Sequence, residues 1–329
     1  DFCDYLVELV EEGEVSEARI NEAVTRILTL KHQLGLFENP YHDFDYYDKF
    51  SSEEFALAAL ETARESITLL KNEADILPLK KDAKVLVTGP SANSLNILNG
   101  SWTHTWQGDK PEYNTKGKLT VIEAIQDRVG KKNVEFVEGT TLEEAKNIDE
   151  AVATAKNVDY IIACIGEKPS TEKPGDINDL TLPQAQIDLV NAMVETGKPV
   201  VLVIVENRPQ IINAIADKVD GILLAYQPGD EGGIAISEII FGDVNPSGKL
   251  PFTYPRHVND LVLYDRKHTE DLDVNFGMNA YNPQFDFGEG MSYTKFEYSN
   301  LSTDREVVLA DEQISIDIDV KNTGNSGGK

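Results

Sequence analysis

Four carboxylates gather in one loop, residues 166–180, which we call the acidic loop. The loop directly follows the apolar run 160–165, and its acidic residues are Glu167, Glu172, Asp176 and Asp179. If the apolar run is a strand of a parallel sheet, the acidic loop lies at its carboxyl end, where such sheets bind their ligands. A carboxyl group there can act as a general acid when desolvation raises its pKa toward the working pH. A merely solvated loop is the alternative.

The chain's two tryptophans, Trp102 and Trp106, are four residues apart in a polar stretch, residues 99–109, which we call the tryptophan loop. Tryptophans of a protein core usually belong to apolar runs. Aromatic side chains in polar loops stack on the C–H faces of sugars, while neighbouring amides and carboxylates bond to the hydroxyl groups. The pattern predicts a sugar-stacking surface, with ordinary packing of the two rings as the alternative.

No pattern for a cofactor or a metal ion accompanies these residues. The stretch 88–92 follows an apolar run, but it matches neither a dinucleotide-binding motif nor a P-loop, and Pro90 lacks the amide that a phosphate site would use. The two cysteines, Cys3 and Cys164, form no disulfide or zinc pattern. The histidines show no metal-binding spacing: His32, His42, His104, His257 and His268. We expect neither a cofactor nor a metal.

The acidic composition restricts the partners. The 329 residues include 30 Lys and Arg against 57 Asp and Glu, which gives a net charge of −27. Affinity for nucleic acid depends on clustered basic residues, so nucleic acids and anionic membrane surfaces are poor partners. No apolar run approaches the roughly 20 residues that span a bilayer. Neutral ligands fit this charge best, and the length favours about two domains.

Strands and helices must then position the two loops. Short apolar runs predict strands at residues 84–89, 133–137, 160–165, 200–205 and 221–225. Helical periodicity predicts helices at residues 120–129, 149–156, 183–195, 209–216 and 231–241. Strands that are apolar on both faces belong to a parallel sheet covered by helices on both sides. Ligands of such a sheet bind beyond the carboxyl ends of its strands.

The flanking segments differ from this alternation. Further helices are predicted at residues 2–13, 16–35 and 53–71. The aromatic and acidic segment 36–52 predicts a linker. Over residues 314–321, isoleucine and valine alternate with polar residues, which predicts a half-buried antiparallel strand at the start of a β-sandwich. The chain opens with Asp1 rather than Met and stops soon after this strand, so we expect a piece of a longer protein.

Three motifs occur in order along the chain: ARESITLLKNE at 63–73, GDVNPSGKLP at 242–251 and FGEGMSYTKF at 287–296. They resemble the C-terminal portion of glycoside hydrolase family 3, the β-glucosidase and exo-β-glucanase family, with Met291 in place of the usual leucine. The resemblance implies an α/β fold, an (α/β)6-type sandwich with a mostly parallel sheet, preceded by helices left from a TIM barrel. The implied domains are the last barrel helices at 1–35, a linker at 36–52, the sandwich domain with the acid/base at 53–295, and the start of a fibronectin III-like domain at 296–329.

Within the family, residues 102–108 and 171–176 resemble the exo-β-glucan glucohydrolase branch. This resemblance implies that Glu172 is the general acid/base and that Trp106 stacks on the sugar beyond the scissile bond, with Trp102 as a second candidate. It also implies an aspartate nucleophile in an SDW-type motif of the barrel, and no Ser-Asp-Trp occurs in this sequence.

The resulting hypothesis is a retaining β-glucosidase or exo-β-glucanase that removes terminal glucose from β-glucans or cello-oligosaccharides. Its partners would be β-linked glucosides or oligosaccharides and the barrel segment of the same protein, in the periplasm or outside the cell. This chain alone would then be inactive. A family 3 β-xylosidase and a non-catalytic sugar-binding module are the alternatives. Glu167 directly follows the apolar run, so we expect it to bind backbone amides rather than a substrate.

Overall fold

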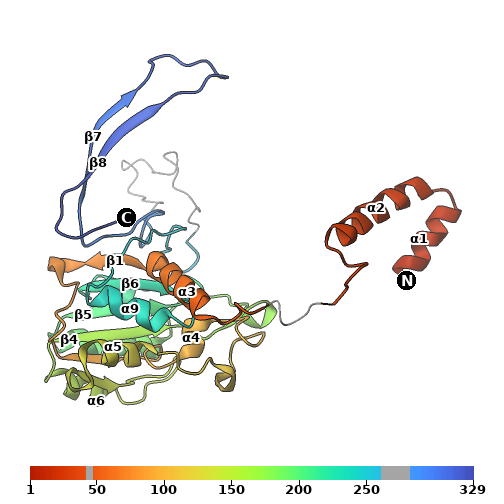
Figure 1. Ribbon diagram of the computed structural model, residues 1–329. Helices are drawn as coiled ribbons and strands as arrows, with labels where there is room; N and C mark the ends of the chain where they lie inside the picture. The colour runs from red at the N-terminus through yellow and green to blue at the C-terminus, as the bar shows by residue number, and fades with distance from the viewer. Residues whose placement is uncertain (42–46, 261–281) are drawn as a thin grey trace. The chain divides into compact units, whose positions relative to one another are not determined.

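The structure, a computed structural model, describes residues 1–41, 47–260 and 282–329 (Figure 1). The chain divides into two compact units, Asp1–Phe55 and Ala56–Lys329. The first unit contains α1 (Phe2–Glu11) and α2 (Glu17–Gln33), which confirm the first two predicted helices. Among the described residues, none in these two helices is buried. The domain boundaries derived from the sequence stay predictions.

The second unit is built on a sheet that has six strands within the described residues, in the order β1-β6-β5-β4-β2-β3. The strands are β1 (Thr68–Asn72), β2 (Val85–Thr88), β3 (Val134–Val137), β4 (Tyr160–Gly166), β5 (Val200–Val205) and β6 (Gly221–Tyr226). Neighbouring strands run parallel except for β1, which pairs antiparallel with β6. The predicted α/β fold with a mostly parallel sheet is therefore confirmed.

Helices pack against both faces of this sheet. One buried core includes side chains of α3 (Glu53–Ser66), α4 (Leu95–Asn99), α5 (Val121–Val129) and α9 (Gly232–Ile240). The opposite core includes α6 (Ile148–Ala155), α7 (Gln184–Glu195) and α8 (Asn213–Ala216). Figure 1 shows α3, α5 and α9 together on one face. Strand β4 serves both cores because successive side chains point to opposite faces: Cys164 belongs to the first and Ile165 to the second.

Two predicted helices need correction. The helix predicted over 53–71 gives way to β1 at its end, because that backbone pairs with β6 at the edge of the sheet. The helix predicted over 209–216 is reduced to α8. Its first half is extended, since the Ile211 amide donates to the Leu180 carbonyl at 2.8 Å.

A second, antiparallel sheet follows the six-stranded sheet along the chain and consists, in the described part of the chain, of β7 (Phe296–Thr303) and β8 (Ile316–Asn322). The antiparallel strand predicted over 314–321 is thus confirmed as β8. The prediction that it is half-buried is wrong, because every residue of β8 is exposed and two strands alone bury neither face. No helix that the structure describes has the length and apolar character needed to cross a bilayer.

Strands β2 and β4 are neighbours in the sheet, and the chain continues from them toward opposite edges of the sheet. From β2 the chain leads through α5 to β3, whereas from β4 it leads through α7 to β5 on the other side. Gly89, directly after β2, has a φ of 100° and approaches β4 so closely that a Cβ would overlap the Cys164 carbonyl oxygen. The crossover helices that follow β2 and β4 lie on opposite faces of the sheet, with α5 in one core and α7 in the other, and ligands of such sheets bind at this point.

Candidate active site

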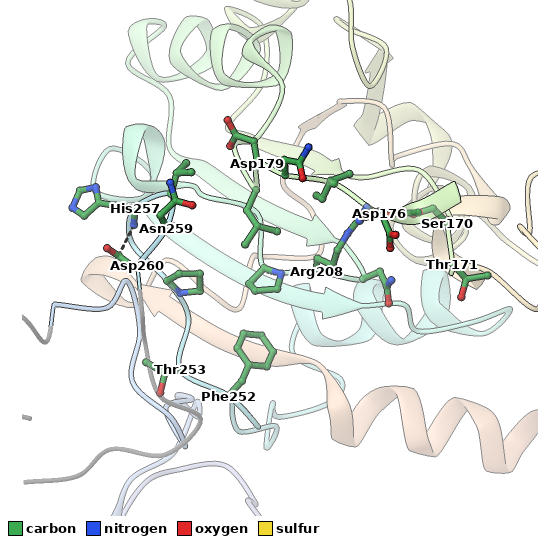
Figure 2. Close-up of a pocket in the computed structure, with 18 of the residues that line it drawn as sticks. Ser170, Thr171, Asp176, Asp179, Arg208, Phe252, Thr253, His257, Asn259 and Asp260 are labelled. Carbon is green, nitrogen blue, oxygen red and sulfur yellow. Dashed lines mark hydrogen bonds between the residues drawn. The ribbon is translucent and has the colours of Figure 1, made fainter. Parts of the chain in front are cut away.

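A cavity of about 1120 Å³ lies at the carboxyl edge of the sheet and contains most of the acidic loop in its wall. Glu172, Asp176 and Asp179 line it, together with Arg208 from the segment after β5. Residues 252–260 form much of the opposite wall. Figure 2 shows Ser170, Thr171 and Asp176 on one side of the cavity and His257, Asn259 and Asp260 on the other. The cavity thus joins segments that lie far apart in the sequence.

Glu172 is exposed and is one of the residues that line this cavity. Its backbone has a φ of 52°, which is unusual for a residue other than glycine and persists only where neighbouring contacts impose it. Its carbonyl accepts a hydrogen bond from the Gly175 amide at 2.8 Å, closing the short turn η5 (Lys173–Gly175). Within the described residues the carboxylate itself has no hydrogen-bond partner, so both its oxygens are available to a ligand.

Glu167 is buried and has a different environment. Its Oε1 accepts hydrogen bonds from the backbone amides of Asn207 and Arg208, at 2.8 and 2.7 Å, as expected from its place directly after β4. Its Oε2 accepts two more from the Arg208 guanidinium, at 3.0 and 2.5 Å. Its lone pairs are therefore occupied, which leaves this glutamate unsuited to proton transfer with a substrate.

Arg208 extends this pair to the turn that carries Glu172. The guanidinium donates to the Gly175 carbonyl and, at 3.3 Å, to the Ser170 hydroxyl. Glu167 and Arg208 together thus connect the segment after β5 to the acidic loop on both sides of Glu172. The ion pair is mostly shielded from solvent, because the Glu167 side chain is 8% exposed and that of Arg208 is 25% exposed.

The two aspartates of the acidic loop have separate surroundings. Asp179 accepts hydrogen bonds from the Thr181 hydroxyl at 2.6 Å and from the Thr181 amide at 2.8 Å. These hydrogen bonds lower the pKa of Asp179 below its usual value, because they stabilise the charged form. Asp176 is exposed on the cavity wall, and its amide donates to the Lys173 carbonyl at 3.2 Å.

A buried glutamate supports the segment after β5. The Tyr254 hydroxyl forms hydrogen bonds with Glu206 Oε1 at 2.8 Å and with the Gln210 carbonyl at 2.7 Å. Burial raises the pKa of Glu206 well above its usual value, with the hydrogen bond from Tyr254 opposing that shift. A protonated Glu206 can donate to the tyrosine oxygen while the tyrosine donates to Gln210, which satisfies all three groups.

The tryptophan loop exposes both of its indole rings. Trp102 is 66% exposed and Trp106 is 46% exposed, and the Trp102 amide donates to the Trp106 carbonyl at 3.0 Å. Neither ring lines the cavity described above. The next residue, Gln107, instead contacts the acidic loop directly, through two hydrogen bonds with the backbone of Thr171. The structure therefore brings the two loops together beside Glu172.

Sequence reasoning missed two residues that connect the site. Gln107 lies within the tryptophan loop, but its partner Thr171 is 64 residues further along, and no local pattern predicts that pairing. Arg208 closely follows the apolar run 200–205, just as the acidic loop follows the apolar run 160–165. Its place at the carboxyl end of a predicted strand therefore made Arg208 predictable.

The described part of the chain contains no cluster of three or more histidine, cysteine, aspartate or glutamate side chains placed to hold a metal ion. His42 and His268 lie outside the described residues. Cys164 is buried, and burial raises the pKa of its thiol to about 12, so it remains a small uncharged side chain. Cys3 is exposed.

Comparisons with known proteins agree on one family. The sequence model of the glycosyl hydrolase family 3 C-terminal domain matches residues 67–293. A lysosomal beta glucosidase of Dictyostelium discoideum is 41% identical over 309 residues, which is 90% of this chain and 37% of that protein. A periplasmic beta-glucosidase of Salmonella typhimurium is 31% identical over 99% of this chain and 47% of its own length.

A beta-xylosidase of Formosa agariphila is also similar, with 32% identity over 94% of this chain and 44% of its own length. Among solved structures, a beta-glucosidase from Listeria innocua in complex with isofagomine has a TM-score of 0.84 and 29% identity, over 96% of this chain and 45% of that chain. The chain thus spans less than half the length of each of these relatives.

Proposed function

This chain belongs to glycoside hydrolase family 3, and we propose that it forms the part of a retaining β-glucosidase or exo-β-glucanase that donates a proton to the glycosidic oxygen. The observation that carries the proposal is the placement of Glu172. Glu172 lines a cavity at the carboxyl edge of the sheet, its carboxylate has no hydrogen-bond partner among the described residues, and it lies beside a loop with two exposed tryptophans. The relatives named beta-glucosidase support the same activity.

Retaining glycosidases use two carboxyl groups about 5–5.5 Å apart. One attacks the anomeric carbon, and the other first protonates the leaving oxygen and then activates the water that releases the sugar. Glu172 takes the second role. The nucleophile is an aspartate on the barrel segment of the same protein, which places the bound glucosyl unit between that segment and the cavity wall.

Terminal β-linked glucose of β-glucans or cello-oligosaccharides is the proposed substrate, and the periplasm or the cell exterior is the proposed location. The periplasmic name of the Salmonella relative supports that location. A β-xylosidase is the second candidate, because relatives with that name match the chain over almost its whole length. Both candidates use Glu172 in the same way and differ in the sugar that they accept.

The stereochemistry of hydrolysis tests this proposal. We expect the enzyme that contains this chain to release glucose first as the β-anomer, which NMR detects before mutarotation. Measured on aryl glycosides, kcat/KM for the β-glucoside should exceed that for the β-xyloside by roughly tenfold or more, because the xyloside lacks the hydroxymethyl group. The α-anomer as first product would contradict the retaining mechanism, whereas a preference for the xyloside would favour the second candidate.

Replacing Trp106 with alanine should weaken turnover of disaccharides and oligosaccharides. Stacking of an aromatic ring contributes about 0.5–1.5 kcal/mol beyond area burial, so kcat/KM for cellobiose should fall by roughly three- to tenfold. Small aryl glucosides should be nearly unaffected. Trp102→Ala is the matched control and should have the smaller effect. Equal losses on both kinds of substrate would show that Trp106 does not contact the second sugar.

A further inference from the structure

The side chain of Gln107 binds both backbone polar groups of one residue in the acidic loop. Its Nε2 donates to the Thr171 carbonyl and its Oε1 accepts from the Thr171 amide, both at 3.1 Å. The side-chain amide of Gln107 thus pairs with the backbone of Thr171 as the backbone of a neighbouring strand would. The Thr171 carbonyl belongs to the peptide group that continues into Glu172, so the orientation of that peptide group depends on Gln107.

The backbone on the Gln107 side is firmly held. The following residue, Gly108, has a φ of 67° and its Cβ position is occupied by the Gly100 carbonyl oxygen, so only glycine fits there. Asn96, on α4, donates from Nδ2 to the Gly108 carbonyl at 2.7 Å. Helix α4 packs into the buried core, so the hydrogen bond from Asn96 fixes the backbone next to Gln107 relative to the rest of the domain.

The backbone on the Glu172 side needs such a contact. A φ of 52° at a glutamate is strained and is kept only if contacts before and after it fix the chain. Arg208 provides contacts at Ser170 and at Gly175. Gln107 provides the contact at the residue immediately before Glu172, and it is the one that comes from the loop with the tryptophans.

We propose that Gln107 is a positioning residue for the acid/base, and that it couples the tryptophan loop to Glu172. This inference rests on the proposed function. A sugar stacked on Trp106 contacts the residue next to Gln107. The hydrogen bonds between Gln107 and Thr171 then hold the backbone of Glu172 in a fixed position relative to that sugar. Proton donation to a bound oligosaccharide thereby depends on the same loop that holds its second sugar.

The first test follows the contact itself, without activity. In the 329-residue chain, hydrogen exchange at the Thr171 amide is measured by NMR for the unchanged protein, Gln107→Ala and Gln184→Ala. We expect exchange about tenfold faster in Gln107→Ala, because one hydrogen bond is lost. Gln184 donates to Asp188 on the surface of α7, so its replacement is a matched control that should leave Thr171 unchanged. Equal exchange in all three proteins would show that the contact does not restrain Thr171.

The second test uses kinetics of the enzyme that contains this chain. In Gln107→Ala, kcat for cellobiose should fall by about ten- to a hundredfold, since a misplaced catalytic group costs that much. Dinitrophenyl glucoside, which needs no protonation, should lose less than about threefold in the glycosylation rate, with KM little changed. Gln184→Ala should match the unchanged enzyme. A loss that is equal for both substrates, or that lies only in KM, would overturn the proposal.

Gln107→Glu provides a rescue. The charged carboxylate keeps the acceptor for the Thr171 amide but opposes the Thr171 carbonyl, whereas the protonated acid restores both hydrogen bonds. Relative to the unchanged enzyme at each pH, activity should therefore recover as the pH falls toward about 4, near the usual pKa of glutamate. A flat ratio would count against positioning through this contact. Glu172→Ala is measured in parallel. If the loss of activity in Glu172→Ala does not depend on the leaving group, the proposed function fails. If only the loss in Gln107→Ala is independent of the leaving group, the coupling alone fails.

Discussion

Glu172→Ala should slow the hydrolysis of glucosides with poor leaving groups by about a thousandfold, since general acid catalysis contributes roughly 10²–10⁴. Activated aryl glucosides should lose far less in the first step, the formation of the glycosyl-enzyme, because their leaving groups need little protonation. The second step, however, loses its general base. Added azide should then restore turnover by attacking the glycosyl-enzyme directly, with β-glucosyl azide as the product.

Asp176→Asn is the matched control for Glu172→Ala, because Asp176 lines the same cavity and lies in the same loop. It should retain the ordinary dependence on the leaving group. Glu167 is a poorer control, since its removal breaks the mostly buried pair with Arg208 and disturbs the loop as a whole. Equal losses of Glu172→Ala on both kinds of substrate, with no rescue by azide, would assign the acid/base role to another residue.

The second large effect is expected for the 329-residue chain by itself, which should hydrolyse no aryl β-glucoside. Two catalytic carboxyl groups work as a unit, so the absence of one removes most of the rate rather than half of it. Activity should appear when the separately produced barrel segment is added. The measurement compares nitrophenol release by the chain, by the barrel segment and by both together, at equal concentrations.

Full activity of the chain alone would contradict a nucleophile on the barrel. Asp176 and Asp179 would then be the first candidates, because both line the cavity with Glu172. Asp179 is the weaker of the two, since the hydroxyl and amide of Thr181 already bond to its carboxylate. Asp176→Asn and Asp179→Asn would distinguish them.

The sheet could be predicted from the sequence because its strands are buried on both faces. Runs such as 160–165 and 200–205 are apolar at every position, and this composition is visible without knowing the partner strands. Strand β1 was missed for the opposite reason. Its neighbour β6 lies some 150 residues later in the chain, and pairing with that distant edge overrides the local preference for continuing α3.

The same distinction between local composition and distant contacts applies to the candidate site. The acidic loop and the tryptophan loop could be singled out because unusual residue types are concentrated within each. Their mutual position could not, because it depends on single hydrogen bonds between distant residues, such as Gln107 with Thr171. Residue types indicate what a segment can do, whereas the contacts that place two segments side by side are set by the packed sheet beneath them.

The attachment of the tryptophan loop and the acidic loop to different strands has a consequence for how this domain can vary. The two loops belong to different crossover connections, and each is attached to its own strand. The tryptophan loop can therefore lengthen, shorten or exchange its aromatic rings without moving β4, the strand that the acidic loop follows. Gln107 is the exception, because its hydrogen bonds with the Thr171 backbone join the two loops, so we expect this position to vary less than its neighbours in the tryptophan loop.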